Sequence, residues 1–260
     1  MNFKLRGYDI LGSKEKSVAI IEETESPKEL AKEIMDEHKN VKSVLMKLSE
    51  RMGIERKRDY KFIMGDPDTE VIHKENYCRF KLDPQKVYFS GREGTERLRI
   101  AEMIKSGERI LVMFSGIAPY AIVISKNQPN CEILCVDVNK DAIRYAEENI
   151  KLNKMKNIKN YCSDIREFSE KGTFDRILMP LPHDAREYLE LACKCLKPEG
   201  GMIHLYIIEP ENEAEKNVKE LMKNFQEKIK GKISYKIKKV LPYSPRTYKY
   251  CVDIQINEGN

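Results

Sequence analysis

The chain has 260 residues, which is enough for one large hydrophobic core or two smaller ones. Charged residues make up 34% of it and the mean hydropathy is −0.59. No stretch approaches the ~20 apolar residues of a transmembrane helix, so a helical membrane protein is excluded. The first ten residues contain no apolar segment typical of a signal peptide, and the seven cysteines are an odd number, so we expect a protein of the reducing cytoplasm.

The positions of the basic residues are more informative than the net charge of +5, which a lysine-rich solvated surface also gives. Basic and aromatic residues are interleaved in three stretches, residues 55–61, 223–239 and 245–250. This pattern is compatible with contact to an RNA backbone as well as with a solvated surface, so the partner stays open at this point.

Short runs of alternating apolar and polar residues predict strands in the first part of the chain. They cover residues 3–11, 17–23, 41–48, 59–64, 69–82 and 86–89. Residues 26–29 (Ser-Pro-Lys-Glu) combine a capping box with proline at the first helical position, which predicts a helix continuing over residues 29–39. Residues 1–92 are therefore predicted to form a small α+β domain.

Strands and helices alternate in the rest of the chain. The predicted strands are residues 108–114, 131–137, 159–163, 175–180, 201–209, 235–241 and 248–256; the helices are 118–126, 140–154 and two that begin near residues 184 and 212. Such alternation predicts a mostly parallel sheet covered on both faces, closed by an antiparallel hairpin through residues 242–247. Residues 93–260 are thus predicted to form an α/β, Rossmann-like domain with a seven-stranded sheet, as in class I methyltransferases.

Acidic residues at two successive strand ends indicate a ligand site, because ligands of doubly wound sheets bind beyond the carboxyl ends of the strands. Gly116 follows the first strand, Asp137 ends the second and Asp164 follows the third. An acid in the position of Asp137 accepts hydrogen bonds from ribose hydroxyls, which indicates an adenosine-type ligand. Residues 113–120 have a single glycine where the dinucleotide fingerprint requires three, which favours S-adenosylmethionine over NAD.

Cysteine pairs and a histidine are weaker candidates for chemistry. Cys131 and Cys135, like Cys193 and Cys195, have the spacing of a metal site but lie in apolar runs, where cysteine is usually a small buried hydrophobe. No metal site is therefore predicted. His73 lies in an alternating strand, where a structural histidine is expected more often than a general base.

Seven segments, in order, resemble the archaeal tRNA (guanosine-37-N1)-methyltransferases of class I and their wyosine-pathway relatives. They are residues 87–102, 113–122, 136–154, 163–168, 175–182, 200–206 and 243–254, read for example as "FSGREGTERLR", "MFSGIAPY", "DRILMPLP" and "YSPRTYKYCVDI". Residues 52–90 in addition resemble the small RNA-contacting domain of that family. The resemblance implies methyl transfer from S-adenosylmethionine to purine 37 of tRNA, with tRNA-Phe as the expected substrate and a monomer as the expected state.

The resemblance also implies which residues act on the base. Guanine N1 carries a proton, so methylation requires a general base and a cation that stabilises the charge developing on O6. By position in the family motifs, Glu96 resembles the base and Arg56 the residue at O6, with Arg58 as an alternative. Without the resemblance, Glu96 reads as an exposed residue in the first turn of a helix and Arg56 as a solvated charge.

The cofactor contacts follow from the same resemblance. The residues expected to line this pocket are Tyr88, Arg97, Phe114, Gly116, Asp137, Val138, Asp164, Ile165 and Pro180. Without the resemblance, Arg97 reads as half of a surface salt bridge and Tyr88 as a half-buried strand tyrosine.

The sequence departs from the family pattern in two places near the site. Val112 stands where most relatives have an acid in the first strand, so the methionine end of the cofactor is expected to be held differently. Pro180-Leu181-Pro182 replaces the usual Asn-Leu-Pro, and proline cannot donate a hydrogen bond to a base edge. An apolar rim suits a larger, flatter ring, so Pro180 is also predicted as a substrate contact for C7 methylation of 4-demethylwyosine, which gives isowyosine.

Several alternatives remain open. Many relatives carry a further N-terminal domain, which we expect to be absent or reduced here, so that the anticodon arm alone is a usable substrate. Methylation of guanosine-37 N1 only, aminocarboxypropyl transfer to the tricyclic base, and a non-catalytic RNA-binding protein are the competing functions. A dehydrogenase is disfavoured because the glycine fingerprint is missing.

Overall fold

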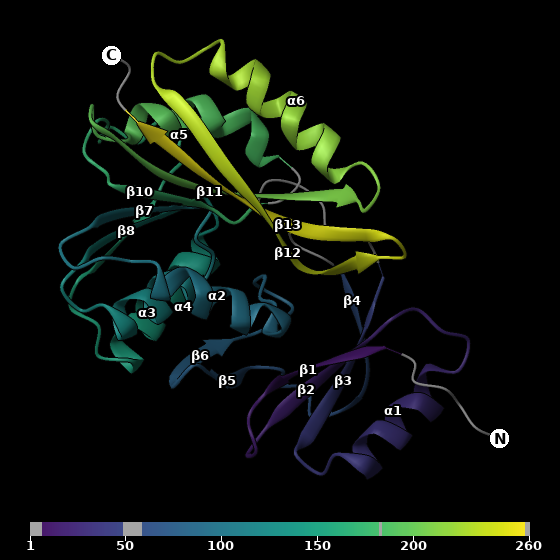
Figure 1. Ribbon diagram of the computed structural model, residues 1–260. Helices are drawn as coiled ribbons and strands as arrows, with labels where there is room; N and C mark the ends of the chain where they lie inside the picture. The colour runs from purple at the N-terminus through teal and green to yellow at the C-terminus, as the bar shows by residue number, and fades with distance from the viewer. Residues whose placement is uncertain (1–6, 49–58, 182–183, 258–260) are drawn as a thin grey trace. The chain divides into compact units, whose positions relative to one another are not determined.

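The structure, a computed structural model, describes residues 7–48, 59–181 and 184–257 (Figure 1). The chain forms two compact units. The first unit comprises Met1–Gly94, Gly116–Pro119 and Asn139–Lys154, and the second comprises Thr95–Ser115, Tyr120–Val138 and Met155–Asn260. None of the helices in the described ranges is both long and apolar enough to cross a lipid bilayer.

The first unit contains a four-stranded sheet, a hairpin and two helices. Its elements are β1 (Tyr8–Gly12), β2 (Ser17–Ile21), α1 (Pro27–Glu37), β3 (Val41–Lys47), β4 (Tyr60–Gly65), β5 (Val71–Glu75), β6 (Cys78–Leu82), the short 3-10 helix η1 (Gly91–Glu93) and α4 (Lys140–Leu152). The sheet has the order β1-β2-β3-β4, and α1 crosses over between the parallel strands β2 and β3. Ala19, Ile21, Ala31, Ile34 and Val44 form the centre of its core.

Helix α4 belongs to the first unit although its sequence lies between two strands of the second unit. The Asn149 side chain accepts a hydrogen bond from the backbone N–H of Lys81 at 2.6 Å and donates to its carbonyl at 3.1 Å. Asn153 makes the same pair of contacts with Arg79. These amide side chains pair with the outer edge of β6 and satisfy its backbone groups. The predicted division into functional domains at residues 92 and 93 stays a prediction.

Two strand predictions in the first unit were wrong in detail. Residues 69–82 form the hairpin β5–β6 rather than one strand, because Asn76 and Tyr77 both have positive φ, 47° and 58°, as a tight type I′ turn requires. Residues 86–89 are not a strand: the N–H groups of Lys86 and Val87 bond the Asp83 carbonyl in a turn. The helix after Ser26 is confirmed, with proline in its first turn, but the Ser26 side chain makes no capping bond.

Tyr77 occupies a backbone conformation that suits glycine, and its side chain is 98% exposed. A residue with a side chain is destabilised by about 1–2 kcal/mol at this φ. Glycine avoids this strain, but the greater freedom of its unfolded chain offsets about 0.5–1 kcal/mol of the gain. We therefore expect Tyr77→Gly to raise the free energy of unfolding by about 0.5–1 kcal/mol in urea denaturation. Tyr77→Ala keeps the strained Cβ and serves as the control. An equal gain in the alanine variant would show that the backbone is not the cause.

The second unit is built on a seven-stranded sheet with the order β12-β13-β11-β10-β7-β8-β9. Its strands are β7 (Arg109–Met113), β8 (Glu132–Asp137), β9 (Ile158–Cys162), β10 (Arg176–Met179), β11 (Gly200–Pro210), β12 (Lys232–Ser244) and β13 (Thr247–Asn257). Its helices are α2 (Gly94–Glu102), α3 (Pro119–Asn127), the 3-10 turn η2 (Ala185–Tyr188), α5 (Leu189–Cys195) and α6 (Ala214–Gln226). Strands β9, β8, β7, β10 and β11 are parallel, and β13 and β12 are antiparallel to their neighbours.

Helices cover both faces of this sheet, with α5 and α6 on one face and α2 and α3 on the other (Figure 1). The buried core contains Leu111, Met113 and Ile177 from the strands together with Leu189 of α5 and Val218 of α6. The alternation of strands and helices and the closing hairpin are confirmed. The hairpin turn is tighter than predicted, because β12 and β13 pair as far as Ser244 and Thr247.

A candidate active site at the carboxyl ends of the strands

The parallel strands of the second unit end at one edge of the sheet, and their register places the ends in one row. Met113 pairs with Val136 and Met179 with Leu205, while β7 and β10 pair in matching register. One residue further along these strands come Phe114, Asp137, Pro180 and Tyr206. The row thus contains three predicted site residues together with Tyr206, which the sequence analysis did not single out.

The loop after β7 has the backbone of a ligand-binding turn. Phe114, Gly116 and Ala118 all have positive φ, 55°, 55° and 62°, and such strained backbone clusters at functional sites. A Cβ at Gly116 would meet nothing nearer than the Tyr88 carbonyl at 3.9 Å, so the space beside it is open. Ser115 Oγ is buried and has no hydrogen-bond partner within the part of the chain that the structure describes. The loop therefore combines a buried hydroxyl with space beside Gly116 directly after β7.

Asp137 and Val138 lie between the end of β8 and the start of α4. Both are half-buried, and Asn139 follows as the N-cap. The Asn139 side chain accepts hydrogen bonds from the N–H groups of Asp141 at 2.9 Å and Ala142 at 3.3 Å. Asn139 thus begins helix α4 two residues after Asp137, the last residue of β8.

Asp164 follows β9, and its carboxylate is already engaged by Arg166. The backbone N–H and the Nε of Arg166 donate to Asp164 Oδ1 at 2.8 and 3.0 Å, and these contacts with Arg166 lower the pKa of the carboxyl. A carboxylate oxygen accepts more than one hydrogen bond, so Asp164 keeps acceptor capacity for a ligand. Ile165 is buried in the core and anchors this turn. The contact of Asp164 with the adenosine-type ligand stays a prediction.

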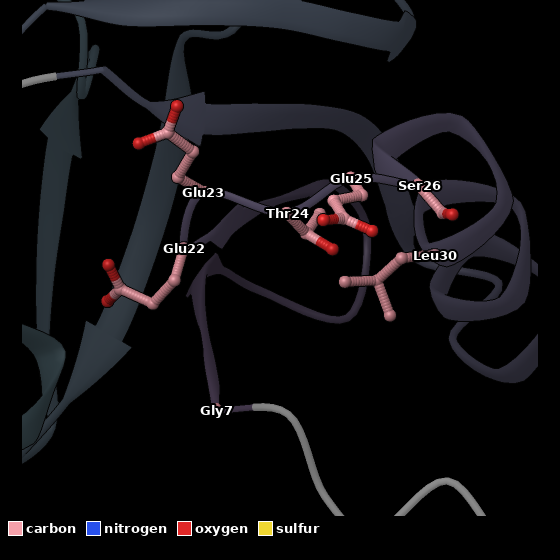
Figure 2. A pocket seen from close by; sticks show the side chains of 7 residues that line it. All are labelled: Gly7, Glu22, Glu23, Thr24, Glu25, Ser26 and Leu30. Atoms are coloured by element: carbon pink, nitrogen blue, oxygen red, sulfur yellow. The ribbon is translucent and has the colours of Figure 1, made fainter.

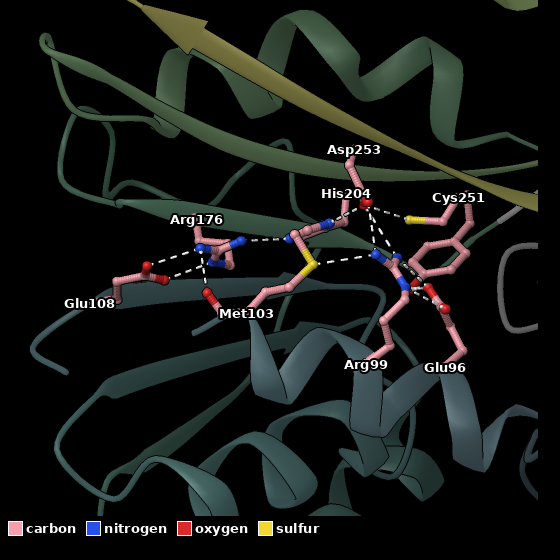
Figure 3. A network of polar contacts seen from close by, with 9 residues as sticks. Glu96, Arg99, Met103, Glu108, Arg176, His204, Cys251 and Asp253 are labelled. Atoms are coloured by element: carbon pink, nitrogen blue, oxygen red, sulfur yellow. Dashed lines mark hydrogen bonds and ion pairs between the residues drawn. The ribbon is translucent and has the colours of Figure 1, made fainter. Parts of the chain in front are cut away.

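Glu96 and Arg97 are buried, with 6% and 2% of their surface exposed, so the surface readings of both residues were wrong. The Arg97 guanidinium lies 5.9 Å from the ring centroid of Tyr120. Both oxygens of Glu96 accept hydrogen bonds: Arg99 donates through Nε at 2.8 Å and Nη2 at 2.7 Å, and the Tyr206 hydroxyl donates at 2.7 Å (Figure 3). Because Tyr206 of β11 is level in register with Pro180, which follows β10, Glu96 is held beside the same row of residues.

Pro180 follows β10 directly and is half-buried, while Leu181 is part of the core. The Leu181 carbonyl accepts a hydrogen bond from Ala185 at 3.1 Å, which leads the chain into η2. Phe114 packs edge-on against Tyr188 of η2, with ring centroids 5.0 Å apart. The rim after β10 is therefore apolar at Pro180, as the sequence indicated. Pro182 lies outside the described residues.

Other predicted site residues belong to the first unit or are not described. Arg56 and Arg58 lie outside the described residues. Tyr88 is half-buried, and its hydroxyl donates to Glu93 at 3.1 Å, but it lies in irregular chain rather than in a strand. His73 packs against Phe89 and lies 3.4 Å from the N–H of Gly12, contacts of a structural histidine.

One hollow of the first unit is lined by acidic side chains and is a poor place for a nucleic acid. It has a volume of about 500 Å³ and is lined by Glu22, Glu23 and Glu25 together with Thr24 and Leu30 (Figure 2). Carboxylates repel phosphate groups, so this hollow does not support the predicted RNA contact of residues 1–92.

Metal binding is disfavoured at the cysteines and at one further cluster. Burial raises the pKa of Cys131 to about 11 and that of Cys135 to about 12, which keeps both thiols protonated at neutral pH. His204, Cys251 and Asp253 bring their ligand atoms within 4.8 Å of one another. However, His204 and Asp253 already contact the guanidinium groups of Arg176 and Arg99, which repel a cation.

The sequence analysis missed four side chains that contact Glu96 directly or through one another: Arg99, Tyr206, Asp253 and His204. A signal for two of them was present. His204 and Asp253 are polar residues inside apolar strand segments, "MIHLYII" and "YCVDIQI". A buried polar residue in a strand needs a hydrogen-bond partner, so such positions indicate a buried polar network.

The strand order, the antiparallel seventh strand and the acids at the strand ends define a Rossmann-like class I methyltransferase. Residues 71–234 match the family described as "TRM5/TYW2 methyltransferase domain", and the chain belongs to this family.

Three relatives illustrate the similarity. The tRNA (guanine(37)-N(1))-methyltransferase Trm5b of Pyrococcus abyssi is 40% identical over 96% of this chain and 74% of its own length, and its crystal structure superposes with a TM-score of 0.84, covering 96% of this chain and 75% of that one. The Nanoarchaeum equitans tRNA (guanine(37)-N(1))/4-demethylwyosine(37)-methyltransferase Taw22 is 28% identical over 96% of this chain and 99% of its own. Methanocaldococcus jannaschii TYW2, solved in complex with AdoMet, has a TM-score of 0.75 at 26% identity, covering 97% and 100% of the chains.

Proposed function

We propose that this chain methylates purine 37 of tRNA with S-adenosylmethionine as the methyl donor. The reaction comprises N1 methylation of guanosine-37 and, in tRNA-Phe, C7 methylation of 4-demethylwyosine. The observation that carries the proposal is a buried carboxylate, Glu96, bonded to Tyr206 in the row of strand ends that also contains Asp137. We further propose that the chain acts as a monomer in the cytoplasm.

The residues at the strand ends fit S-adenosylmethionine. When bound, this cofactor supplies an electrophilic methyl group on a positively charged sulfur. Asp137, at the end of β8, would accept hydrogen bonds from the ribose hydroxyls, and the open backbone at Gly116 would let the ligand approach. Val112 is fully buried and offers no charge, whereas the unpartnered hydroxyl of Ser115 can donate to the cofactor. We propose that Ser115 makes part of the contact to the cofactor that relatives make with an acid at the position of Val112.

Glu96 has the chemistry of the general base. Its two oxygens accept three hydrogen bonds from Arg99 and Tyr206, which hold the carboxylate in one orientation. A carboxylate has about four acceptor positions, so Glu96 can still accept the N1 proton of guanine. As guanine N1 gives up this proton, negative charge develops on O6, and Arg56 is proposed to stabilise it.

The test is methyl incorporation from labelled S-adenosylmethionine into two forms of tRNA-Phe. One form carries guanosine-37 and the other 4-demethylwyosine, and mass spectrometry identifies each modified nucleoside. We expect methylation of both. Methylation of guanosine alone would retain the family function and remove the C7 activity. A mass increase of an aminocarboxypropyl group, or cofactor binding without any transfer, would overturn the proposal.

Pro180 offers a more specific prediction about the choice of base. Pro180→Asn introduces a donor that can bond the edge of guanine, while it removes part of the apolar rim. One hydrogen bond is worth about 0.5–1.5 kcal/mol, so we expect the ratio of guanosine to tricycle methylation to rise by about threefold to tenfold. Pro180→Ala has neither ring nor donor and separates the two effects. An unchanged ratio in Pro180→Asn would show that this rim does not select the base.

A further inference from the structure

Hydrogen-bonded polar side chains form a continuous row from Glu96 to Glu108 in the second unit (Figure 3). Arg99 bonds Glu96 and also donates to Asp253, through Nη1 at 2.8 Å and Nη2 at 3.3 Å. Asp253 contacts His204 Nδ1 at 2.6 Å, and His204 Nε2 lies 2.8 Å from Nη1 of Arg176. At the far end Arg176 donates two hydrogen bonds to Glu108, at 2.7 and 2.9 Å.

The two neighbours of His204 determine its tautomer. Arg176 can only donate, so His204 Nε2 must be the acceptor of that contact. Nδ1 therefore carries the proton and donates it to Asp253 Oδ1. Complete burial lowers the pKa of His204, with Arg176 and Arg99 acting in the same direction, so the ring is neutral. Burial alone would raise the pKa of Asp253, but hydrogen bonds from His204 and Arg99 hold it below its usual range.

The charges in this row do not balance. Among its six side chains, three carboxylates face two guanidinium groups, and His204 is neutral. Within the row, Arg99 is the one guanidinium that contacts two carboxylates, Glu96 and Asp253. Without Asp253, the positive charge of Arg99 would act on Glu96 alone and stabilise its carboxylate form.

We propose that Asp253, oriented by His204, is a positioning residue that shares the Arg99 guanidinium with Glu96 and thereby keeps Glu96 ready to accept a proton. This inference rests on the proposed function of Glu96 as the base. It assigns a role to the antiparallel strand β13, which carries Asp253 but contributes no strand end to the row of cofactor residues.

Other titratable groups lie around Glu96, and we expect their effect on Glu96 to be the same in the wild type and in the variants described below. Helix α2 contributes Arg97 beside Arg99, α3 contributes Tyr120, and β11 contributes Tyr206. On β13, Cys251 donates to Asp253 Oδ1 at 3.2 Å, and Lys249 Nζ lies 4.7 Å from the centroid of the Tyr206 ring. Burial keeps the pKa values of Tyr206 and Cys251 well above their ordinary values, so neither group is charged at neutral pH.

The central experiment compares wild type with Asp253→Asn, which keeps the shape and an acceptor for His204 but removes the charge. In single-turnover methylation of guanosine-37 we expect the acidic limb of the pH–rate profile to move down by about one pH unit, because Glu96 loses a neighbouring negative charge. The plateau rate should fall by about threefold to tenfold, as a weaker base is less efficient. Asp175→Asn removes a similar carboxylate at the amino end of β10, where it bonds Lys197 and the Arg109 N–H, and should leave the profile unchanged.

A matched pair of variants tests the part played by His204. Asn places a donor where the imidazole has Nδ1, whereas Gln places its amide where the ring has Nε2. We therefore expect His204→Asn to retain most of the rate and His204→Gln to lose about tenfold, with circular dichroism confirming that both fold. Equal rates in the two variants would exclude an orienting role for His204.

An independent measurement separates this inference from the proposed function. The titration of Glu96 is followed by NMR of protein labelled with ¹³C at the glutamate carboxyls, and Glu96→Gln identifies its resonance. A lower titration midpoint in Asp253→Asn supports the role of Asp253 even if no tRNA is methylated. An unchanged midpoint overturns the inference, whether or not the wild-type enzyme methylates tRNA.

Discussion

Glu96→Gln lowers the single-turnover rate of methyl transfer to guanosine-37 by about 100-fold to 10,000-fold, the usual contribution of a positioned general base. The side chain is buried, and Gln keeps one oxygen that accepts from Arg99 Nη2 and the Tyr206 hydroxyl, while the bond from Arg99 Nε to the second oxygen is lost, so circular dichroism should confirm that the variant folds. The amide of Gln cannot accept the N1 proton of guanine as the Glu96 carboxylate does. The measurement is rapid-quench methylation with saturating enzyme and labelled cofactor.

The control for this variant is Glu102→Gln, an exposed position on the same helix. It should methylate at the wild-type rate, and both variants should bind S-adenosylmethionine with unchanged affinity in calorimetry. A rate loss of less than about threefold in Glu96→Gln would be too small for the removal of a general base. The assignment of Glu96 would then fail even if the enzyme were active.

Glu108→Gln should destabilise the second unit by about 3 kcal/mol, because it leaves the Arg176 guanidinium buried without its counter-charge. Arg176 donates two hydrogen bonds to Glu108, and the exposed fractions of the two side chains are only 6% and 13%. Urea denaturation followed by circular dichroism measures the loss. Activity at 25 °C should change far less than in Glu96→Gln, since Glu108 lies at the far end of the row.

The control is Glu132→Gln, which also removes a carboxylate partner of an arginine, here Arg109, at the start of β7. The Glu132 side chain is 41% exposed, and surface pairs contribute less than about 1 kcal/mol. A loss of similar size in the two variants would mean that burial of Arg176 does not determine the cost.

The second unit was largely predictable from the sequence because its strands are buried on both faces and read as apolar runs. Residues 131–137 and 201–209, for example, are within two residues of strands β8 and β11. The first unit was harder, since alternation continues through the β5–β6 turn and also through residues 86–89, where Val87 and Phe89 are buried without being in a strand. Periodicity reports burial, and it cannot tell whether a partner strand exists.

Asp137 and Gly116 could be found from the sequence because the fold places strand ends at the ligand site. Glu96 could be found only by resemblance. Its neighbours could not be found in either way: Arg99 and Asp253 are 154 residues apart, and no local pattern relates them. Such contacts depend on the strand order, which places β13 next to β11 and brings Asp253 to His204.

Strand β13 follows every parallel strand in the sequence, and this order has a consequence for biosynthesis. A nascent chain that has emerged only as far as β12 already contains every parallel strand, with Asp137 and Tyr206 among their residues. It still lacks Asp253, so Arg99 would pair with Glu96 alone. The residues predicted to bind the cofactor are therefore translated before Asp253, the residue proposed to share Arg99 with Glu96. Because β13 pairs with both β11 and β12 and contributes Val252 and Ile254 to the core, the sheet of the second unit is completed only when this last strand has been made.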